Sequence, residues 1–272
     1  MPEEKKRRRK MEQKCILNIH LRVKRMEETA DWFCRNLFFT REESGRLLKN
    51  GSARLNLETE EGFPAEIHGP EEMCLGFRHI ALETYDIQKA IQYCKEKGLR
   101  LQLSKTGGAM HSGKVYGTGM DYFNILTDFG LTVEVSQKLH VKRAWDGPVI
   151  FGLDHIGLQV EDVPEAMRFY EKLGFVREFE PVVNESDGHQ IICCMEALGD
   201  AVIELYDFHD QKNLKRQKNP VISGLSMEKN GGSAAACVFF YGPSGERLAF
   251  PNPPEWTKSI AGLRISQRAD RA

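Results

Sequence analysis

The sequence lacks a strong charge of either sign and any long apolar run. Its 38 Lys and Arg residues nearly balance 39 Asp and Glu residues, which leaves a formal net charge of -1 over 272 residues. A balanced chain gives no reason to expect nucleic acid as a partner. No apolar run is long enough to span a membrane, and no segment resembles a secretory signal. We therefore expect a cytoplasmic protein that acts on a small-molecule substrate, with no nucleic-acid and no membrane partner.

Cysteine-pairing motifs and several common catalytic motifs are also absent. The seven cysteines are odd in number, and none lies in a C-x-x-C pair. We expect free thiols in a reducing compartment, because a disulfide framework needs paired cysteines. The glycine-rich ranges 106–108 and 117–119 neither follow a strand nor open a helix, which argues against a dinucleotide site. The sequence contains no P-loop, nucleophile elbow or zinc-finger spacing.

Charge of one sign gathers only at the N-terminal end, where residues 5–10 are all Lys or Arg. We expect residues 1–14 to form a disordered basic tail. A nuclear-localisation patch is the alternative interpretation, in which case the protein would be nuclear. A translation start at Met11 also stays open. Residues 255–272 are expected to form a C-terminal tail.

Two stretches of the chain read almost alike, each with a His near the start of a strand-like run. They are R-H-I-A-L-E-T from Arg78 and D-H-I-G-L-Q-V from Asp154. Each is followed by residues at helical spacing, then by three extended segments, and the last segment carries one central Glu. That residue is Glu134 in the first copy and Glu204 in the second. The pattern predicts two βαβββ units, at residues 77–135 and 152–207.

Two further copies are less complete. In residues 15–60, Asn18 and Asn56 align with the His and the Glu, and His20 shares a strand face with Asn18. The partial copy between residues 220 and 250 ends in a hairpin pattern with Ala249 in place of the Glu, and no helix pattern precedes this hairpin. We number the four units in chain order as modules 1 to 4, with module 4 shortened.

The H-I-G-L-x-V strand and the helix ending in F-Y-E-K-L-G-F resemble the vicinal oxygen chelate superfamily, which includes glyoxalase I, small-molecule resistance proteins such as those for bleomycin, and extradiol dioxygenases. The resemblance covers residues 15 to 252. It implies an α+β fold in which tandem βαβββ modules form cupped, barrel-like mixed β-sheets with flanking helices. It also implies a first glyoxalase-like domain at 15–137, a linker at 138–151 and a second such domain at 152–254.

In this superfamily two modules cup a metal ion, and each module gives a ligand from its first and its last strand. Pairing of module 2 with module 3 would bring together His79, Glu134, His155 and Glu204. Modules 1 and 4 would then hold Asn18 and Asn56 without a metal ligand from module 4. The other pairing, 1 with 2 and 3 with 4, would leave two half-sites. The sequence leaves both pairings open.

Two imidazoles and two carboxylates suit a divalent ion such as Zn, Ni, Co, Mn or Fe. We therefore expect His79, Glu134, His155 and Glu204 to be metal ligands, with Glu134 or Glu204 as the general base. The competing interpretation is that these residues bind no metal, because a single His in a strand is more often structural and a single Glu usually faces solvent. A buried carboxylate without a partner is costly, however, and a metal ion would offset that cost.

The resemblance implies a metal-dependent lyase or isomerase that moves a proton next to a carbonyl, acting as a monomer or a homodimer. A metal-free, resistance-type binding protein is the alternative, and an extradiol-type dioxygenase is disfavoured because module 4 lacks the His and Glu it would need. Other histidines give weaker signals. His20 is a candidate cavity-facing ligand; His111, His189 and His209 are candidates to line a pocket; His68 and His140 resemble linker residues.

Overall fold

The computed structural model describes residues 15–59, 73–186, 189–208, 214–217, 220–229 and 238–250. The expected tails at 1–14 and 255–272 lie outside these ranges, as do His68 and His209.

Three helices and eighteen strands make up the described part of the chain. The first segment forms β1 (Cys15–Arg22), α2 (Met26–Leu37), β2 (Thr40–Arg41), β3 (Leu47–Asn50) and β4 (Ala53–Glu58). The second forms β5 (Cys74–Glu83), α3 (Ile87–Glu96), β6 (Leu101–Gln102), β7 (Met110–Ser112), a 3-10 turn (Val115–Gly117), β8 (Met120–Leu126) and β9 (Thr132–Lys138). The third forms β10 (Phe151–Gln159), α4 (Val163–Leu173), β11 (Val176–Arg177), β12 (Val182–Ser186), β13 (His189–Leu198) and β14 (Ala201–Phe208). The last forms β15 (Lys215–Arg216), β16 (Ile222–Lys229), β17 (Val238–Tyr241) and β18 (Arg247–Phe250).

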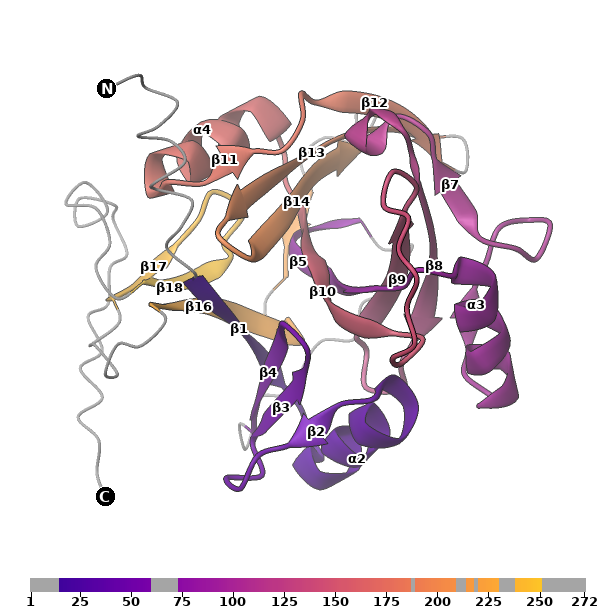
Figure 1. Ribbon diagram of the computed structural model, residues 1–272. Coiled ribbons are helices and arrows are strands. Elements are labelled where there is room, and N and C mark those ends of the chain that lie inside the picture. The colour runs from indigo at the N-terminus through magenta and orange to yellow at the C-terminus, as the bar shows by residue number, and fades with distance from the viewer. Residues whose placement is uncertain are drawn as a thin grey trace, which may run out of the picture.

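The strands form two mixed sheets, which have the cupped α+β architecture expected from the sequence. The smaller sheet runs β17-β18-β16-β1-β4-β3-β2, and the larger follows β11-β13-β14-β10-β5-β9-β8-β6, with β12, β15 and β7 paired alongside. Figure 1 shows the larger sheet strongly curved, with α3 and α4 at the periphery and α2 beside the smaller sheet.

Sheet pairing decides which modules meet. β5 of module 2 pairs antiparallel with β10 of module 3, and β1 of module 1 pairs antiparallel with β16 of module 4. Of the two pairings that the sequence left open, the structure therefore has 2 with 3 and 1 with 4. Each sheet thus draws on both sides of the 138–151 segment, and the division into domains at 15–137 and 152–254 stays a prediction.

Local sequence explains where the helices begin. Asp86 and Asp162 cap α3 and α4, because each side chain accepts a hydrogen bond from a backbone N–H three residues on, at 3.0 and 2.7 Å. Gly174 ends α4 in the left-handed conformation that glycine adopts without strain. Each helix packs one apolar face against the sheets.

The strand pattern of the sequence was less informative than the helix pattern. Of the three extended segments expected after the helix in module 3, the first is divided into two short strands, β11 and β12. β16 was not predicted at all, because its Ser- and Gly-containing sequence resembles a loop. The strand exists because β1 pairs with it along most of its length. Gly224 fits this crowded position, since a Cβ there would lie 3.0 Å from the Arg247 carbonyl oxygen.

Candidate metal centre

Four neighbouring strands of the larger sheet carry the candidate ligands. The strand order β14-β10-β5-β9 places Glu204, His155, His79 and Glu134 side by side. β5 and β10 pair antiparallel with Ile80 opposite Ile156, and each His comes one residue before this Ile. The outer strands β9 and β14 run parallel to their neighbours, and each Glu comes one residue after the residue that pairs with the Ile. All four side chains therefore leave the same face of the sheet.

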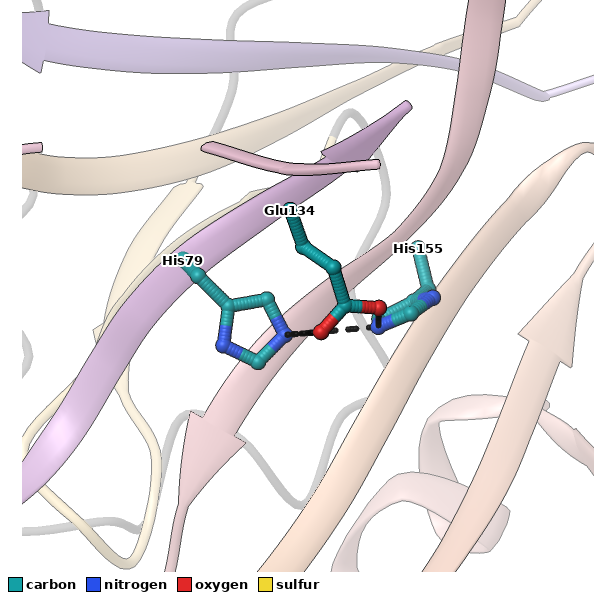
Figure 2. A group of neighbouring side chains, drawn as sticks. All are labelled: His79, Glu134 and His155. Atoms are coloured by element: carbon teal, nitrogen blue, oxygen red, sulfur yellow. Dashed lines mark hydrogen bonds and ion pairs between the residues drawn. The ribbon is translucent and has the colours of Figure 1, made fainter. Parts of the chain in front are cut away.

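The four side chains converge on a small volume, and Figure 2 shows three of them, His79, Glu134 and His155. The Nε2 atoms of His79 and His155 lie 3.3 Å apart. Oε2 of Glu134 is 3.9 Å from Nε2 of His79, and its Oε1 is 3.6 Å from Nε2 of His155. Oε2 of Glu204 lies 3.4 and 3.6 Å from the same two nitrogens.

These distances fit a divalent ion better than they fit hydrogen bonds. Metal–nitrogen and metal–oxygen bonds of about 2.0–2.2 Å place ligand atoms roughly 3–3.5 Å apart. Oε1 of Glu134 is buried without a hydrogen-bond partner, a costly state that a cation would relieve. One ligand atom from each of His79, Glu134 and His155 lies within 4.8 Å of the others. Oε2 of Glu204 comes as close to the two imidazole nitrogens as the Glu134 oxygens do, so it is a fourth candidate ligand.

Burial and mutual charge perturb the titration of the centre. Burial opposes the charged form of His155, but Asp154, Glu134 and Glu204 outweigh it and raise the pKa of His155 to about 9. Burial raises the pKa of Glu134 in spite of the two nearby imidazoles. For Glu204, burial is outweighed by His79 and His155, which lower its pKa. The two carboxylates thus occupy different environments within one site.

A buried charge network supports His155 from behind. Asp154 has no exposed side-chain surface, and its carboxylate lies 2.7 Å from Lys138 Nζ and 2.6 Å from Ser136 Oγ. Its Oδ1 is 3.6 Å from Nδ1 of His155, the ring nitrogen that points away from the cluster. Asp154 reaches this position because the β5–β10 ladder has an irregularity between Leu153 and His155. At 3.6 Å the two atoms are too far apart for a hydrogen bond, so Asp154 acts on the imidazole through its charge, which favours one ring orientation and increases the basicity of the ring.

Two residues hold the His79 ring. Tyr206 stacks against it with ring centroids 6.0 Å apart, and Gly157 lies directly opposite it in the ladder. A Cβ at position 157 would overlap the imidazole, so only glycine leaves room for this ring orientation. None of Asp154, Gly157 and Tyr206 was predicted as a site residue, although Asp154 and Gly157 belong to the same D-H-I-G motif as His155.

The cluster opens into a cavity of about 480 Å³, within the range of small-molecule sites. Its lining includes both candidate glutamates, His79, the cation Arg78, polar side chains such as Gln159 and Asn124, and several methionines. His111 also lines it and bonds to Asp121 at 2.6 Å, in agreement with the pocket position expected for this histidine. His140 lies near Tyr116, with ring centroids 5.3 Å apart, and the side chain of His189 is outside the described part.

The smaller sheet presents a different set of residues at the equivalent positions. Asn18 and Asn56 occupy them in module 1, as the sequence alignment predicted, and Ala249 occupies one in module 4. His20 does not join a metal-type cluster among the described residues, because its ring nitrogens bond to Glu58 and Ser226.

Within the described part of the chain, five cysteines are free thiols, and no helix has the length and apolarity to cross a membrane.

Comparison with known proteins places this geometry in a family context. The family model of the Glyoxalase/Bleomycin resistance protein/Dioxygenase superfamily matches residues 16–135 and 152–218. Glyoxalase I from Zea mays has a similar structure, with a TM-score of 0.58, 14% identity, and coverage of 88% of this chain and 92% of the other. A single-substitution variant of that enzyme has a TM-score of 0.61 and 14% identity, with coverage of 90% of this chain and 95% of the other. A proposed dioxygenase from Bacillus subtilis has a TM-score of 0.54 and 12% identity, with coverage of 87% of this chain and 84% of the other. No curated protein sequence matches the chain.

Proposed function

This chain belongs to the Glyoxalase/Bleomycin resistance protein/Dioxygenase superfamily, and we propose that it is a divalent-metal-dependent lyase or isomerase. Its reaction would be a proton transfer next to a carbonyl group of a small molecule. One observation carries the proposal: two imidazoles and two carboxylates from four adjacent strands converge at the wall of a cavity large enough for a small substrate.

The geometry suggests a division of labour between the two carboxylates. His79, His155 and Glu134 would hold the ion. Glu204 is as close to both imidazoles as Glu134, but it is the more exposed carboxylate, with 15% of its side chain exposed compared with 7% for Glu134. We therefore assign the role of general base to Glu204, which would take the proton from the carbon next to the carbonyl. When bound, the ion would polarise the substrate oxygen on which negative charge develops.

All four candidate ligands come from one chain, so the site needs no residue from a second subunit. We propose Zn, Ni, Co, Mn or Fe as the ion, because imidazole and carboxylate ligands suit these metals. The substrate would be a small carbonyl compound, and the site would work in a monomer or in each subunit of a homodimer.

The test begins with metal analysis of the purified protein. We expect one transition metal per chain in the wild type and none in the variant carrying His79→Ala and His155→Ala. The metal-loaded protein is then incubated in D₂O with the hemithioacetal of methylglyoxal and glutathione, and with simpler α-hydroxycarbonyl compounds. Exchange of the C–H next to the carbonyl, followed by NMR, reports proton abstraction even where turnover is slow.

Variants of the two carboxylates separate their roles. Glu204→Gln should retain the metal and lose exchange, whereas Glu134→Gln should lower metal affinity. Equal metal content in the wild type and in the double His variant would refute the metal site and leave a metal-free binding protein. Metal binding without exchange for any carbonyl compound would refute the proton-transfer chemistry alone.

One observation favours a second function, oxygen chemistry. His79, His155 and Glu134 have the composition of the facial triads of non-haem Fe(II) oxygenases, which is two His and one carboxylate. In that case Glu204, although it lies as close to the imidazoles, would not be a ligand. Oxygen consumption by the Fe(II)-loaded protein in the presence of catechols or 2-oxo acids, absent with Zn, would favour this function over the first.

A further inference from the structure

The smaller sheet repeats the strand arrangement of the metal centre without its ligands. β1 and β16 pair antiparallel with Ile19 opposite Leu225, as β5 and β10 pair with Ile80 opposite Ile156. Asn18 and Gly224 come one residue before this pair, where the larger sheet has its two histidines. The same face carries His20 and Ser226, each one residue after the pair. This face has therefore exchanged metal-type residues for hydrogen-bonding ones.

A continuous chain of hydrogen bonds joins Ser226, His20 and Glu58, the last residue of β4. Oγ of Ser226 lies 2.8 Å from Nε2 of His20, and Nδ1 of His20 lies 2.8 Å from Oε1 of Glu58. Ser223 Oγ lies 3.2 Å from the other Glu58 oxygen and 3.2 Å from the His20 carbonyl oxygen, and its one proton can be donated to either. A hydroxyl bonded to an imidazole whose second nitrogen is bonded to a carboxylate is the arrangement of a Ser-His-acid triad.

The protonation pattern suits a base at His20. A carboxylate only accepts, so Glu58 favours the tautomer with hydrogen on Nδ1 and a free lone pair on Nε2, facing the Ser226 hydroxyl. The hydrogen bond from His20 outweighs burial and holds the pKa of Glu58 below its usual range, so the carboxylate is ionised near neutral pH. Asn56 Nδ2 lies farther from Nδ1, at 3.3 Å, and an amide rotation would present its oxygen instead.

The triad is accessible to a small reagent. Ser226 is half-buried, and the side chains of His20 and Glu58 are 16% and 31% exposed. Asn18 is the direct cross-strand neighbour of Ser226 on the same face, so its amide is a candidate donor to an oxygen on a carbon attached to Ser226.

We propose that Ser226, His20 and Glu58 form a second, metal-independent site that hydrolyses small esters by acyl transfer. Ser226 Oγ attacks the ester carbonyl carbon while its proton passes to His20 Nε2. The ester C–O bond breaks, and the leaving alcohol takes that proton. Water then attacks the acyl-serine through the same imidazole, which releases the acid and restores the Ser226 hydroxyl. Glu58 is a positioning residue, because it acts through His20.

The test uses the full chain after removal of metal with a chelator. A fluorophosphonate probe is added, and the labelled peptide is identified by mass spectrometry. Hydrolysis of p-nitrophenyl acetate is followed in parallel, with an initial burst expected from the acyl-enzyme. We expect a single adduct on Ser226, and Ser226→Ala and His20→Gln should lower hydrolysis by about 100-fold or more. Because labelling is mapped in the wild type, the result does not depend on whether a variant folds.

Two variants of Glu58 test its positioning role. Glu58→Gln should lower hydrolysis strongly, and Glu58→Asp should restore part of it, because a purely structural role would not distinguish charge in this way. Ser104→Ala, which removes an exposed hydroxyl bonded to Thr106, and the double variant His79→Ala with His155→Ala should both leave hydrolysis unchanged. Absence of an adduct on Ser226, or hydrolysis that survives Ser226→Ala, would overturn the proposal without bearing on the metal site.

Discussion

Gly157 sets the position of a candidate metal ligand without touching the metal itself. Its missing side chain leaves the space that the His79 imidazole occupies. We expect Gly157→Ala to displace the ring and to lower zinc affinity by roughly 10-fold or more, the magnitude typical of lost ligand orientation. Competition with a chromophoric chelator measures this affinity.

Gly108→Ala is the matched control for that substitution. A Cβ at position 108 would meet only Ser104 Oγ, at 4.0 Å, so the control should keep the affinity of the wild type. An unchanged affinity in Gly157→Ala would show that His79 does not hold the ion in the orientation found here.

Asp154 provides a second test at the scale of single residues. Its charge faces the distal nitrogen of His155 and is balanced by Lys138. Asp154→Asn keeps the shape but removes the charge that orients this imidazole, so we expect metal affinity to fall about 10- to 100-fold. Isothermal titration with zinc measures the loss.

The control for this variant is another aspartate paired with a histidine. Asp121 bonds to His111 at 2.6 Å, and this histidine is largely exposed. Asp121→Asn should therefore leave zinc binding unaltered. If both asparagine variants lowered the affinity equally, the effect would come from net charge and not from the orientation of His155.

The sequence predicted the four candidate ligands because they occupy equivalent places in a repeat. It could not predict their support. Asp154 precedes His155 in a strand, and strict alternation would place the two on opposite faces; the irregularity of the β5–β10 ladder changes that relation. The bond between His20 and Ser226 joins residues 206 positions apart, a relation that no local pattern contains. Residues at repeated positions could thus be predicted from the sequence, whereas contacts that depend on departures from the repeat could not.

At the scale of elements, helix α4 is tied to the turn before β18 by a buried polar pair. The Tyr170 hydroxyl donates to Oε1 of Glu246 at 2.8 Å, and the Ser244 backbone N–H donates to Oε2 at 2.8 Å. Burial outweighs these bonds and raises the pKa of Glu246 to about 7.

This shift gives stability a definite pH dependence. The folded state holds the Glu246 proton more tightly than the unfolded state, so the contribution is fully present below the ordinary pKa of 4.5 and is lost as the pH rises to about 7. The loss has an upper limit of about 3 kcal/mol. We expect Glu246→Gln to flatten the dependence of the unfolding free energy on pH in this window, as measured by urea unfolding. Glu180→Gln, at an exposed position, should keep the slope of the wild type.

Helices were more predictable than strands for a physical reason. An amphipathic helix that begins at an Asp cap has all of its signals within a dozen residues, as α3 and α4 do, so its residues can be recognised from local sequence. β16 depends on β1, which lies some 200 residues earlier in the chain, and its own residues favour a loop. A strand whose partners are this distant is determined by the sheet and not by its own sequence.

At the scale of the whole molecule, chain order and spatial order differ. The two central modules share one sheet, and the first and last share the other, so the segment that closes the smaller sheet is synthesised after the entire larger sheet. Each sheet therefore brings together strands that are distant in sequence. Such non-local pairing predicts slow folding relative to helical proteins of similar size.

A metal ion at the centre would join the two halves of the larger sheet, because its ligands come from β5 and β9 on one side and β10 and β14 on the other. Binding to the folded state alone adds about 2.7 kcal/mol of stability at a ligand concentration 100 times Kd. For a chain of this size we expect zinc to raise Tm by roughly 5–10 °C. The variant carrying His79→Ala and His155→Ala should show no rise, whereas His20→Gln, in the other sheet, should show the rise of the wild type. A rise of equal size in the double variant would place the stabilising ion elsewhere on the protein and contradict the metal centre between modules 2 and 3.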